Sequence, residues 1–291
     1  MNPRVTERIA EIRNDSVHGA SWLSRQAIST LNLAVGESQA ATVADFADEI
    51  NMVAAELIEA RPGMISIANY ITRLIDQITL ESKKGRRLSQ LKTFAQAKSQ
   101  GLIELSEEAS SKAAESGSGI ISNGDIMLTC SYSSTICKAF ELAKQKGTEF
   151  RVIISESRSR DKFYGEMTAA HLKQHRIPVE VIQDQDIRLH VPEANKALVG
   201  ADSILADGSL INGTPTYELA RAAREEHIPF YTVCETAKFD IRGSIPNPPG
   251  LEPGFDKIPP ALITGIINEN GIITPDEVAH YTASKVNSRE G

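Results

Sequence analysis

The sequence is poor in the residues that build disulfide scaffolds and structural metal sites. Its 291 residues include only three cysteines, Cys130, Cys137 and Cys234, and their spacing matches no metal-ligand motif. The six histidines are scattered along the chain, which argues against a structural zinc site, and we expect neither a metal nor a cofactor. An odd and sparse set of thiols is typical of a reducing cytoplasm, where we expect this protein to be found.

Long apolar runs and an excess of positive charge are missing as well. No apolar run approaches the roughly 20 residues that a membrane helix needs, and residues 1–15 lack the apolar core of a signal peptide. Lys and Arg number 31 against 38 Asp and Glu, which gives a net charge of −7. This balance disfavours direct binding to nucleic acid or to an anionic membrane, but it leaves room for a local basic pocket that holds one phosphate.

Three common catalytic fingerprints are absent too. The chain contains no GxGxxG run and no P-loop, which disfavours a dinucleotide-dependent enzyme and a nucleoside triphosphatase. It contains no GxSxG elbow, so nothing supports a Ser-His-Asp hydrolase.

Residues 1–115 are expected to form a helical N-terminal domain. Between Glu37 and Glu59 apolar residues recur at the three-and-four spacing of a helix stripe. The members of this stripe are Val43, Phe46, Ile50, Val53, Leu57 and Ile58. Pro62 and Gly63 interrupt the pattern, and further helical segments are expected over residues 65–80 and 87–115. Stripes of this kind predict a helical bundle.

Residues 116–291 have a different pattern, which begins at the Gly/Ser-rich stretch 116–119. Compact apolar runs alternate with helical patterns, as in a parallel sheet covered on both faces. The expected strands are 126–128, 152–154, 179–182, 197–199, 231–233 and 262–267, and the expected helices are 133–145, 165–175 and 216–227. Residues 241–260, rich in Pro and Gly, are expected to be a long loop. The predicted fold class is therefore α/β: a helical N-terminal domain, then a Rossmann-like parallel-sheet domain that is expected to bind a ligand.

Candidate functional residues follow from the rule that open parallel sheets bind ligands at the carboxyl ends of their strands. The segments at these ends are Thr129–Ser133, Glu156–Arg158, Gln183–Asp184, Gly200–Asp202 and Glu235–Lys238. Together they hold hydroxyls, a thiol, basic side chains and carboxylates. This mixture suits a polyhydroxylated anionic ligand, and backbone N–H groups at the start of the helix after Ser133 could meet an anion.

Each candidate also has a purely structural interpretation. Ser131 or Ser133 could simply cap a helix, and Asp202 could cap a turn rather than act as an acid with a raised pKa. Arg158 and Lys238 could be solvated surface groups rather than phosphate ligands. Cys130, like Cys234, fits a buried packing residue better than a nucleophile.

The ordered series of short motifs resembles one family over nearly the whole chain. The motifs are Ala60-Arg61-Pro62, Gly124–Thr129, Glu156-Ser157-Arg158, Val199–Ile204, Gly208–Asn212, Glu235–Phe239 and Phe255–Pro260. The family comprises the alpha, beta and delta subunits of translation initiation factor 2B, ribose-1,5-bisphosphate isomerase and methylthioribose-1-phosphate isomerase. Its isomerases interconvert an aldose phosphate and its ketose with a cysteine as base and an aspartate as acid.

The resemblance assigns the acid to Asp202 and the position of the family's cysteine to Ser131, with Cys130 one residue earlier. A serine hydroxyl is a far poorer base than a thiolate near neutral pH, so the base is missing unless Cys130 points inward. The resemblance further implies ligand contacts at Gly19, Ala20, Arg61, Arg158, Asn212 and Lys238. The family's ligand lysine is replaced by Gly213.

Three functional interpretations remain open at this point. The first is an alpha-type initiation factor 2B-like protein that holds a sugar phosphate or a nucleotide between its domains and has lost isomerase activity. The second is an aldose-ketose isomerase of the ribose-1,5-bisphosphate isomerase type, which uses Asp202 with Cys130 or another base. The third is a scaffold subunit without a small ligand. A homo-oligomer, either a dimer or a dimer-based hexamer, is expected, and translation initiation factor 2 is a candidate partner.

Overall fold

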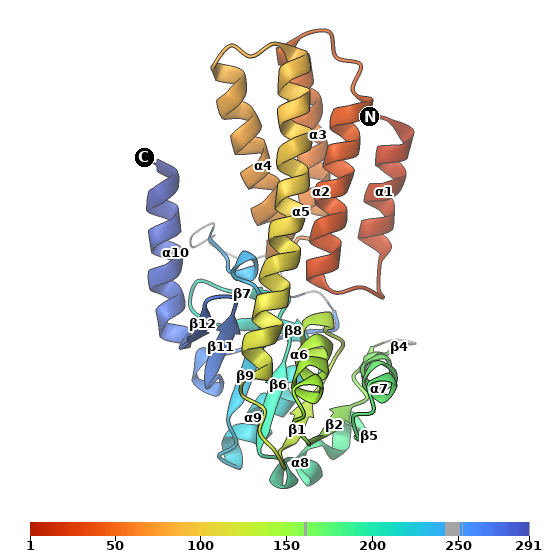
Figure 1. Cartoon of the computed structure of the whole chain (residues 1–291), viewed down its shortest axis with the longest axis vertical. Coiled ribbons are helices and arrows are strands. Elements are labelled where there is room, and N and C mark those ends of the chain that lie inside the picture. The colour runs from red at the N-terminus through yellow and green to blue at the C-terminus, as the bar shows by residue number, and fades with distance from the viewer. Residues whose placement is uncertain (160–161, 242–250, 252, 291) are drawn as a thin grey trace. The chain divides into compact units, whose positions relative to one another are not determined.

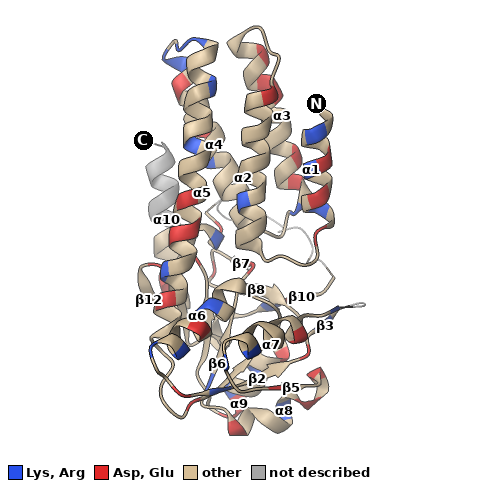
Figure 2. Ribbon diagram, turned by 45° about the vertical axis from the view of Figure 1, so that its right-hand side comes forward, with Lys and Arg blue, Asp and Glu red and all other residues tan. Residues whose placement is uncertain are grey.

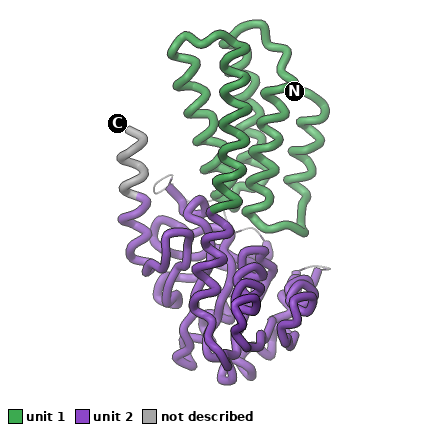
Figure 3. Tube along the Cα trace, viewed as in Figure 1, with its two compact units in different colours: residues 1–108 green, residues 109–291 purple. Residues whose placement is uncertain are grey.

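The computed structural model describes all residues except 160–161, 242–250, 252 and 291, and it describes side chains in the last helix only as far as Thr282. The chain divides into two compact units, Met1–Glu108 (unit 1) and Ala109–Gly291 (unit 2) (Figure 3). The helix that carries the division runs from Leu88 to Ser118, so the Gly/Ser-rich stretch begins inside a helix.

Unit 1 consists of helices, as expected, and they lie alongside one another (Figure 1). They are α1 (Pro3–Asn14), α2 (Ala20–Glu37), α3 (Val43–Ala60), α4 (Ile65–Lys83) and the first part of α5 (Leu88–Ser118). Both basic and acidic residues occur on these helices (Figure 2). Within the described residues, no helix combines the length and the hydropathy that crossing a bilayer would require.

The apolar stripe predicted for α3 forms the buried side of that helix. Phe46, Ile50, Val53 and Leu57 are all buried. The helix begins at Val43 rather than at Glu37, because the Thr42 side chain accepts a hydrogen bond from the backbone N–H of Asp45 and so caps it. The segment that the sequence predicted as one helix, Glu37–Glu59, therefore includes the last residue of α2, a loop and α3.

Unit 2 is built on a seven-stranded sheet in the order β12-β11-β9-β6-β1-β2-β5 (Figure 1). Its strands are β1 (Ile126–Thr129), β2 (Arg151–Ser155), β5 (Val179–Ile182), β6 (Lys196–Val199), β9 (Phe230–Val233), β11 (Gly265–Asn268) and β12 (Gly271–Ile273). All neighbours pair in parallel except β11 and β12. The six expected strands are confirmed, although the last one begins at Gly265 rather than at Leu262. The first six in chain order have the doubly wound Rossmann arrangement.

Helices cover both faces of this sheet. The helices are α6 (Ser134–Gln145), α7 (Tyr164–Gln174), α8 (Ile187–His190) and α9 (Thr216–Glu225), and α10 (Pro275–Glu290) follows the last strand. Strand residues Met127 and Val152 pack with Phe140 of α6 on one face. Leu128 packs with Leu219 of α9 on the other, because successive side chains of a strand point to opposite faces. Burying each such side chain is worth about 1.5–3 kcal/mol relative to leaving it exposed.

A second, antiparallel sheet was not anticipated from the sequence. It has the order β10-β8-β7, formed by β7 (Ser203–Ile204), β8 (Leu210–Gly213) and β10 (Phe255–Ile258). The expectation of a loop over residues 241–260 is therefore wrong for β10, while residues 242–250 and 252 lie outside the described part of the chain. A two-stranded hairpin, β3 (Arg158–Ser159) and β4 (Lys162–Phe163), precedes α7.

Candidate functional site

Two loops of unit 2 meet where the strand order of the large sheet reverses. Strands β1 and β6 are neighbours there, although 66 residues lie between Thr129 at the end of β1 and Lys196 at the start of β6. The loop after β6 begins with Gly200, where an added Cβ would lie only 2.6 Å from Ser133 Oγ of the loop after β1. The reversal point is the usual ligand site of such folds, and the contact requires glycine because no side chain fits between the loops.

The loop after β1 is fixed by hydrogen bonds from its neighbours. Ser131 has a positive φ of 62°, its backbone N–H donates to Ser157 Oγ at 2.6 Å, and its carbonyl accepts from Thr168 Oγ1 at 2.9 Å. The Ser133 hydroxyl caps α6 by accepting from the backbone N–H of Ile136 at 3.4 Å. Ser131 therefore has a defined place, and of the two serines proposed as caps only Ser133 takes that role.

Cys130 lies in the core rather than facing solvent. Its side chain is buried, and Sγ lies 3.2 Å from Oγ1 of Thr216. Burial raises the pKa of the Cys130 thiol to about 12. The thiolate fraction near neutral pH is therefore about one in 10⁵.

Asn212 belongs to the same buried chain of polar groups. Its side-chain nitrogen donates to Thr216 Oγ1 at 2.9 Å, and that hydroxyl donates to the carbonyl oxygen of Gly213 at 2.5 Å. Thr216 therefore joins Asn212 to Cys130 at the start of α9. A buried polar group without a hydrogen-bond partner would destabilise the fold. The network therefore fixes the positions of β8, α9 and the end of β1 relative to one another.

Ser131 and Gly213, the positions to which the resemblance assigned the family's cysteine and lysine, lie next to each other. An added Cβ at Gly213 would lie 2.7 Å from Ser131 Oγ and 3.4 Å from Ser131 Cβ. The Ser131 side chain therefore fills the space that the first carbon of a lysine at position 213 would need. Restoring a lysine at this position requires Ser131 to rotate away.

Lys238 is hydrogen-bonded to the residue that precedes Asp202 in the loop after β6. Lys238 is almost fully buried, and its ammonium group donates to the carbonyl oxygen of Ala201 at 2.7 Å. The same Nζ lies 3.8 Å from Oε2 of Glu235, a carboxylate that is itself fully buried. Asp202 is half-buried, and its backbone N–H donates to Ile211 of β8 at 2.9 Å. The ion pair thus braces the turn that carries Asp202.

Arg158 stands apart from this buried group. Its side chain is exposed, and its guanidinium group lies over the Phe163 ring at 5.4 Å. The loop beneath it is held by the Asp184 carboxylate, which accepts from the backbone N–H groups of Ser157 at 2.8 Å and Arg158 at 3.0 Å and from the Ser155 hydroxyl. Arg158 is therefore presented to solvent on a fixed backbone.

Three of the predicted ligand residues belong to unit 1. Gly19 occupies the N-cap position of α2 and is followed by the buried Ala20. Arg61 follows α3, and its Nη1 donates to the carbonyl oxygen of Asp15 at 2.6 Å. The Asp15 carboxylate in turn accepts from the backbone N–H of His18 at 2.8 Å. Arg61 is thereby tied to the loop that leads into α2.

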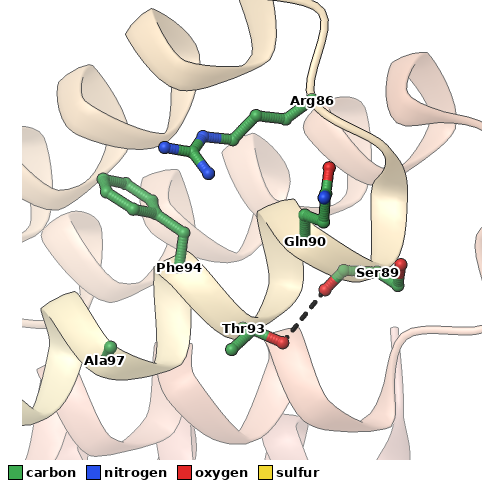
Figure 4. A pocket seen from close by; sticks show the side chains of 6 residues that line it. All are labelled: Arg86, Ser89, Gln90, Thr93, Phe94 and Ala97. Carbon is green, nitrogen blue, oxygen red and sulfur yellow. Dashed lines mark hydrogen bonds between the residues drawn. The ribbon is translucent and has the colours of Figure 1, made fainter.

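A pocket elsewhere in unit 1 contains none of the predicted residues. It lies on the first turns of α5 and is lined by Arg86, Ser89, Gln90, Thr93, Phe94 and Ala97 (Figure 4). Arg86 lies over the Phe94 ring at 5.5 Å, and Thr93 Oγ1 donates to the carbonyl oxygen of Ser89 at 3.1 Å. Arg86 also donates to the Glu81 carboxylate, and the lining of the pocket includes no carboxylate or thiol.

Sequence reasoning assigned no role to several residues that organise the site. Thr216 joins Asn212 to Cys130, Asp184 holds the loop of Arg158, and Glu235 pairs with Lys238. Asp256 accepts from the Thr214 hydroxyl and from the backbone N–H of Tyr217, both at 3.0 Å. Asp184 and Glu235 were visible as strand-end carboxylates, but their partners are distant in sequence.

A family comparison agrees with this architecture. The model of the initiation factor 2 subunit family matches residues 16–247. The match covers most of both units, and the chain belongs to this family.

Three relatives indicate the range of this family. A protein of Pyrococcus furiosus named as translation initiation factor eIF-2B subunit 2-like is 30% identical over 284 residues, which cover 94% of this chain and 97% of the relative. A ribose 1,5-bisphosphate isomerase of Thermococcus kodakarensis is 30% identical over 295 residues, which cover 93% of this chain and 91% of the relative. The crystal structure of the Pyrococcus horikoshii OT3 translation initiation factor eIF-2B superposes with a TM-score of 0.81 at 28% identity, covering 94% of this chain and 98% of that one.

Proposed function

We propose that this chain is an alpha-type initiation factor 2B-like protein that binds a sugar phosphate or a nucleotide at the strand ends of unit 2 and does not isomerise it. The observation that carries the proposal is the pair Cys130–Ser131. The resemblance assigns the position of the family's base to Ser131, and the thiol of the preceding Cys130 is buried with a pKa of about 12. A group protonated so completely near neutral pH cannot remove a proton from a sugar carbon efficiently.

Anion binding is supported by the chemistry of groups at the same rim. The N-terminal turn of α6 follows Ser133, and the partial positive charge of a helix start favours a phosphate. Arg158 is exposed on a rigid loop, so it can reach a second anionic group. Asp202, half-buried after β6, carries a carboxylate of the kind that hydrogen-bonds to sugar hydroxyls.

Thermal-shift measurements test this binding. Ribose 1,5-bisphosphate or adenosine monophosphate should raise the melting temperature, whereas unphosphorylated ribose should not. Arg158→Gln should weaken the effect, and Arg224→Gln, an exposed arginine of α9, should leave it unchanged. No shift with any phosphorylated compound would contradict the proposal.

Self-association belongs to the same proposal. A structural neighbour from C. thermophilum is described as a tetrameric eIF2B-beta2-delta2 complex, with a TM-score of 0.80 at 20% identity. We expect unit 2 to mediate a homodimer or a dimer-based hexamer, and translation initiation factor 2 is the candidate partner. Light scattering during size exclusion tests the assembly, and a monomer at micromolar concentration would contradict it.

An isomerase is the alternative, favoured by the 30% identity to a ribose 1,5-bisphosphate isomerase. In this case Asp202 is the acid, and Cys130 or another group is the base. Conversion of aldose to ketose followed by NMR, and lost in Asp202→Asn and Cys130→Ala, would establish it. Turnover that survives both substitutions would remove these residue assignments.

A further inference from the structure

Three potential metal ligands converge between α6 and α7, outside the group of strand-end loops. His171 and His175 are four residues apart on α7, so one helical turn brings their rings to the same side. Glu141 comes from the facing helix α6. The rings of the two histidines stack with their centroids 5.0 Å apart. Helix α7 thus brings together two of the six histidines of the chain.

One ligand atom from each residue lies within 4.8 Å of the other two. Nε2 of His175 is 3.9 Å from Oε2 of Glu141. Zinc bonds of about 2.0–2.1 Å in a tetrahedral arrangement set ligand atoms roughly 3.3 Å apart. Small rotations of these partly exposed side chains therefore suffice to enclose an ion.

An unsatisfied nitrogen points to a missing ligand. Nε2 of His171 is buried and has no hydrogen-bond partner among the described residues. An imidazole nitrogen without a hydrogen-bond partner is a group that a metal ion can take as a ligand.

The Glu141 carboxylate is held in position by its own helix. Its Oε1 accepts from Lys138 Nζ at 2.9 Å and from Gln145 Nε2 at 2.7 Å, which leaves Oε2 on the side of His175. Secondary contacts of this kind commonly orient carboxylates that bind a metal.

We propose that Glu141, His171 and His175 form a binding site for one divalent transition-metal ion of the zinc class, with water at the remaining position. Two imidazoles and one carboxylate suit zinc and its neighbours, whereas magnesium and calcium prefer an all-oxygen shell. The ion joins α6 to α7, the two helices whose amino-terminal regions contribute Ser133 and Thr168 to the loop after β1. Metal binding therefore stiffens the support of that loop.

Isothermal titration of the chelator-treated, tag-free full chain with zinc chloride tests this site. We expect one ion per chain, a rise in melting temperature with zinc, and neither effect with magnesium. His171→Ala and His175→Ala should each weaken zinc binding by at least roughly tenfold. His280→Ala, an exposed histidine of α10, should leave the affinity unchanged. Cobalt should give the visible absorption of a four-coordinate ion, and it should be lost in the same two variants.

Three results would overturn the proposal. One is the absence of stoichiometric zinc binding by the wild-type chain. The second is zinc affinity that is unchanged in both histidine variants, because the ion would then bind elsewhere. The third is equal loss in His280→Ala, which would indicate nonspecific binding to surface imidazoles. His171→Gln and a circular dichroism spectrum of each variant separate loss of the ligand from loss of the fold.

Discussion

The two units satisfy their buried polar side chains in different ways. In unit 1 Thr30 and Ser99 each donate to the carbonyl four residues earlier in their own helix, and the Ser24 hydroxyl also contacts the Ser66 hydroxyl of α4 at 2.7 Å. In unit 2 Thr216 joins Cys130, which follows β1, to Asn212 of β8, and Lys238 crosses to the loop after β6. These bonds of unit 1 lie within one helix or between two packed helices, whereas those of unit 2 fix the relative positions of loops. The second arrangement is the one expected where a ligand site has to be held in shape.

The largest expected effect on stability comes from the buried ion pair Lys238–Glu235 of unit 2. Lys238→Met should cost about 3–5 kcal/mol, since it leaves the Glu235 charge buried without its partner. Removing the exposed pair Arg4–Glu37 of unit 1 should cost at most about 1 kcal/mol. Urea unfolding measures both.

A double variant supplies the control for that experiment. Lys238→Met with Glu235→Gln should be less destabilised than the single Lys238→Met change, because no charge is left without a partner. If Lys238→Met costs no more than the surface pair, the buried pair does not brace the Asp202 turn.

Two glycines, one in each unit, differ in the space that a Cβ would have. An added Cβ at Gly165 would lie 2.1 Å from the carbonyl oxygen of Ser155, so Gly165→Ala should destabilise unit 2 by about 3 kcal/mol. At Gly101, in the part of α5 that belongs to unit 1, nothing lies within 4 Å, and Gly101→Ala should stabilise by about 1 kcal/mol. Thermal unfolding gives both signs, and destabilisation by Gly101→Ala would show that a neighbouring group occupies the space beside this glycine.

A smaller loss of stability is expected when the network around the Thr216 hydroxyl is broken. Thr216→Val removes the acceptor of Asn212 and should cost about 2 kcal/mol. Thr30→Val, which removes only a bond to its own helix, should cost less than about 1 kcal/mol. Equal losses in urea titrations would mean that the Thr216 network is no stronger than a local bond.

The smallest effect concerns cysteines, all of which lie in unit 2. The folded-state pKa of Cys130 is about 12 against an ordinary value of 9.0, so the unfolded state loses this proton first. Stability should therefore be unaffected below pH 8 and fall between pH 9 and 12, by up to about 1.4 kcal/mol per pH unit for each such thiol. Urea unfolding at pH 8 and pH 10 should show a drop that is about 1 kcal/mol smaller in Cys130→Ala. Identical drops would place the thiol in a more solvated environment.

Sequence patterns predicted the elements better than the contacts between them. The strands of the large sheet follow from compact apolar runs such as Val152–Ile154, because burial on both faces leaves a simple signature. The short strand β10 escaped notice, since Pro and Gly flank it and its pairing with β8 is non-local. The register of antiparallel neighbours is set by tertiary packing, which local patterns do not encode.

The candidate site was predictable to the level of strand ends and no further. The rule for doubly wound sheets selects Ser131, Asp202 and Lys238 from the sequence alone. It could not indicate that Lys238 is buried beside Glu235 or that Ser131 fills the space above Gly213, because both depend on contacts between distant segments.

The most direct test follows ribose 1,5-bisphosphate and the protein in a single NMR sample. We predict ligand signals that broaden or shift on binding while no ketose forms, both in the wild-type chain and in Asp202→Asn. Steady appearance of the ketose that is abolished by Asp202→Asn would contradict the proposed function and identify an active isomerase.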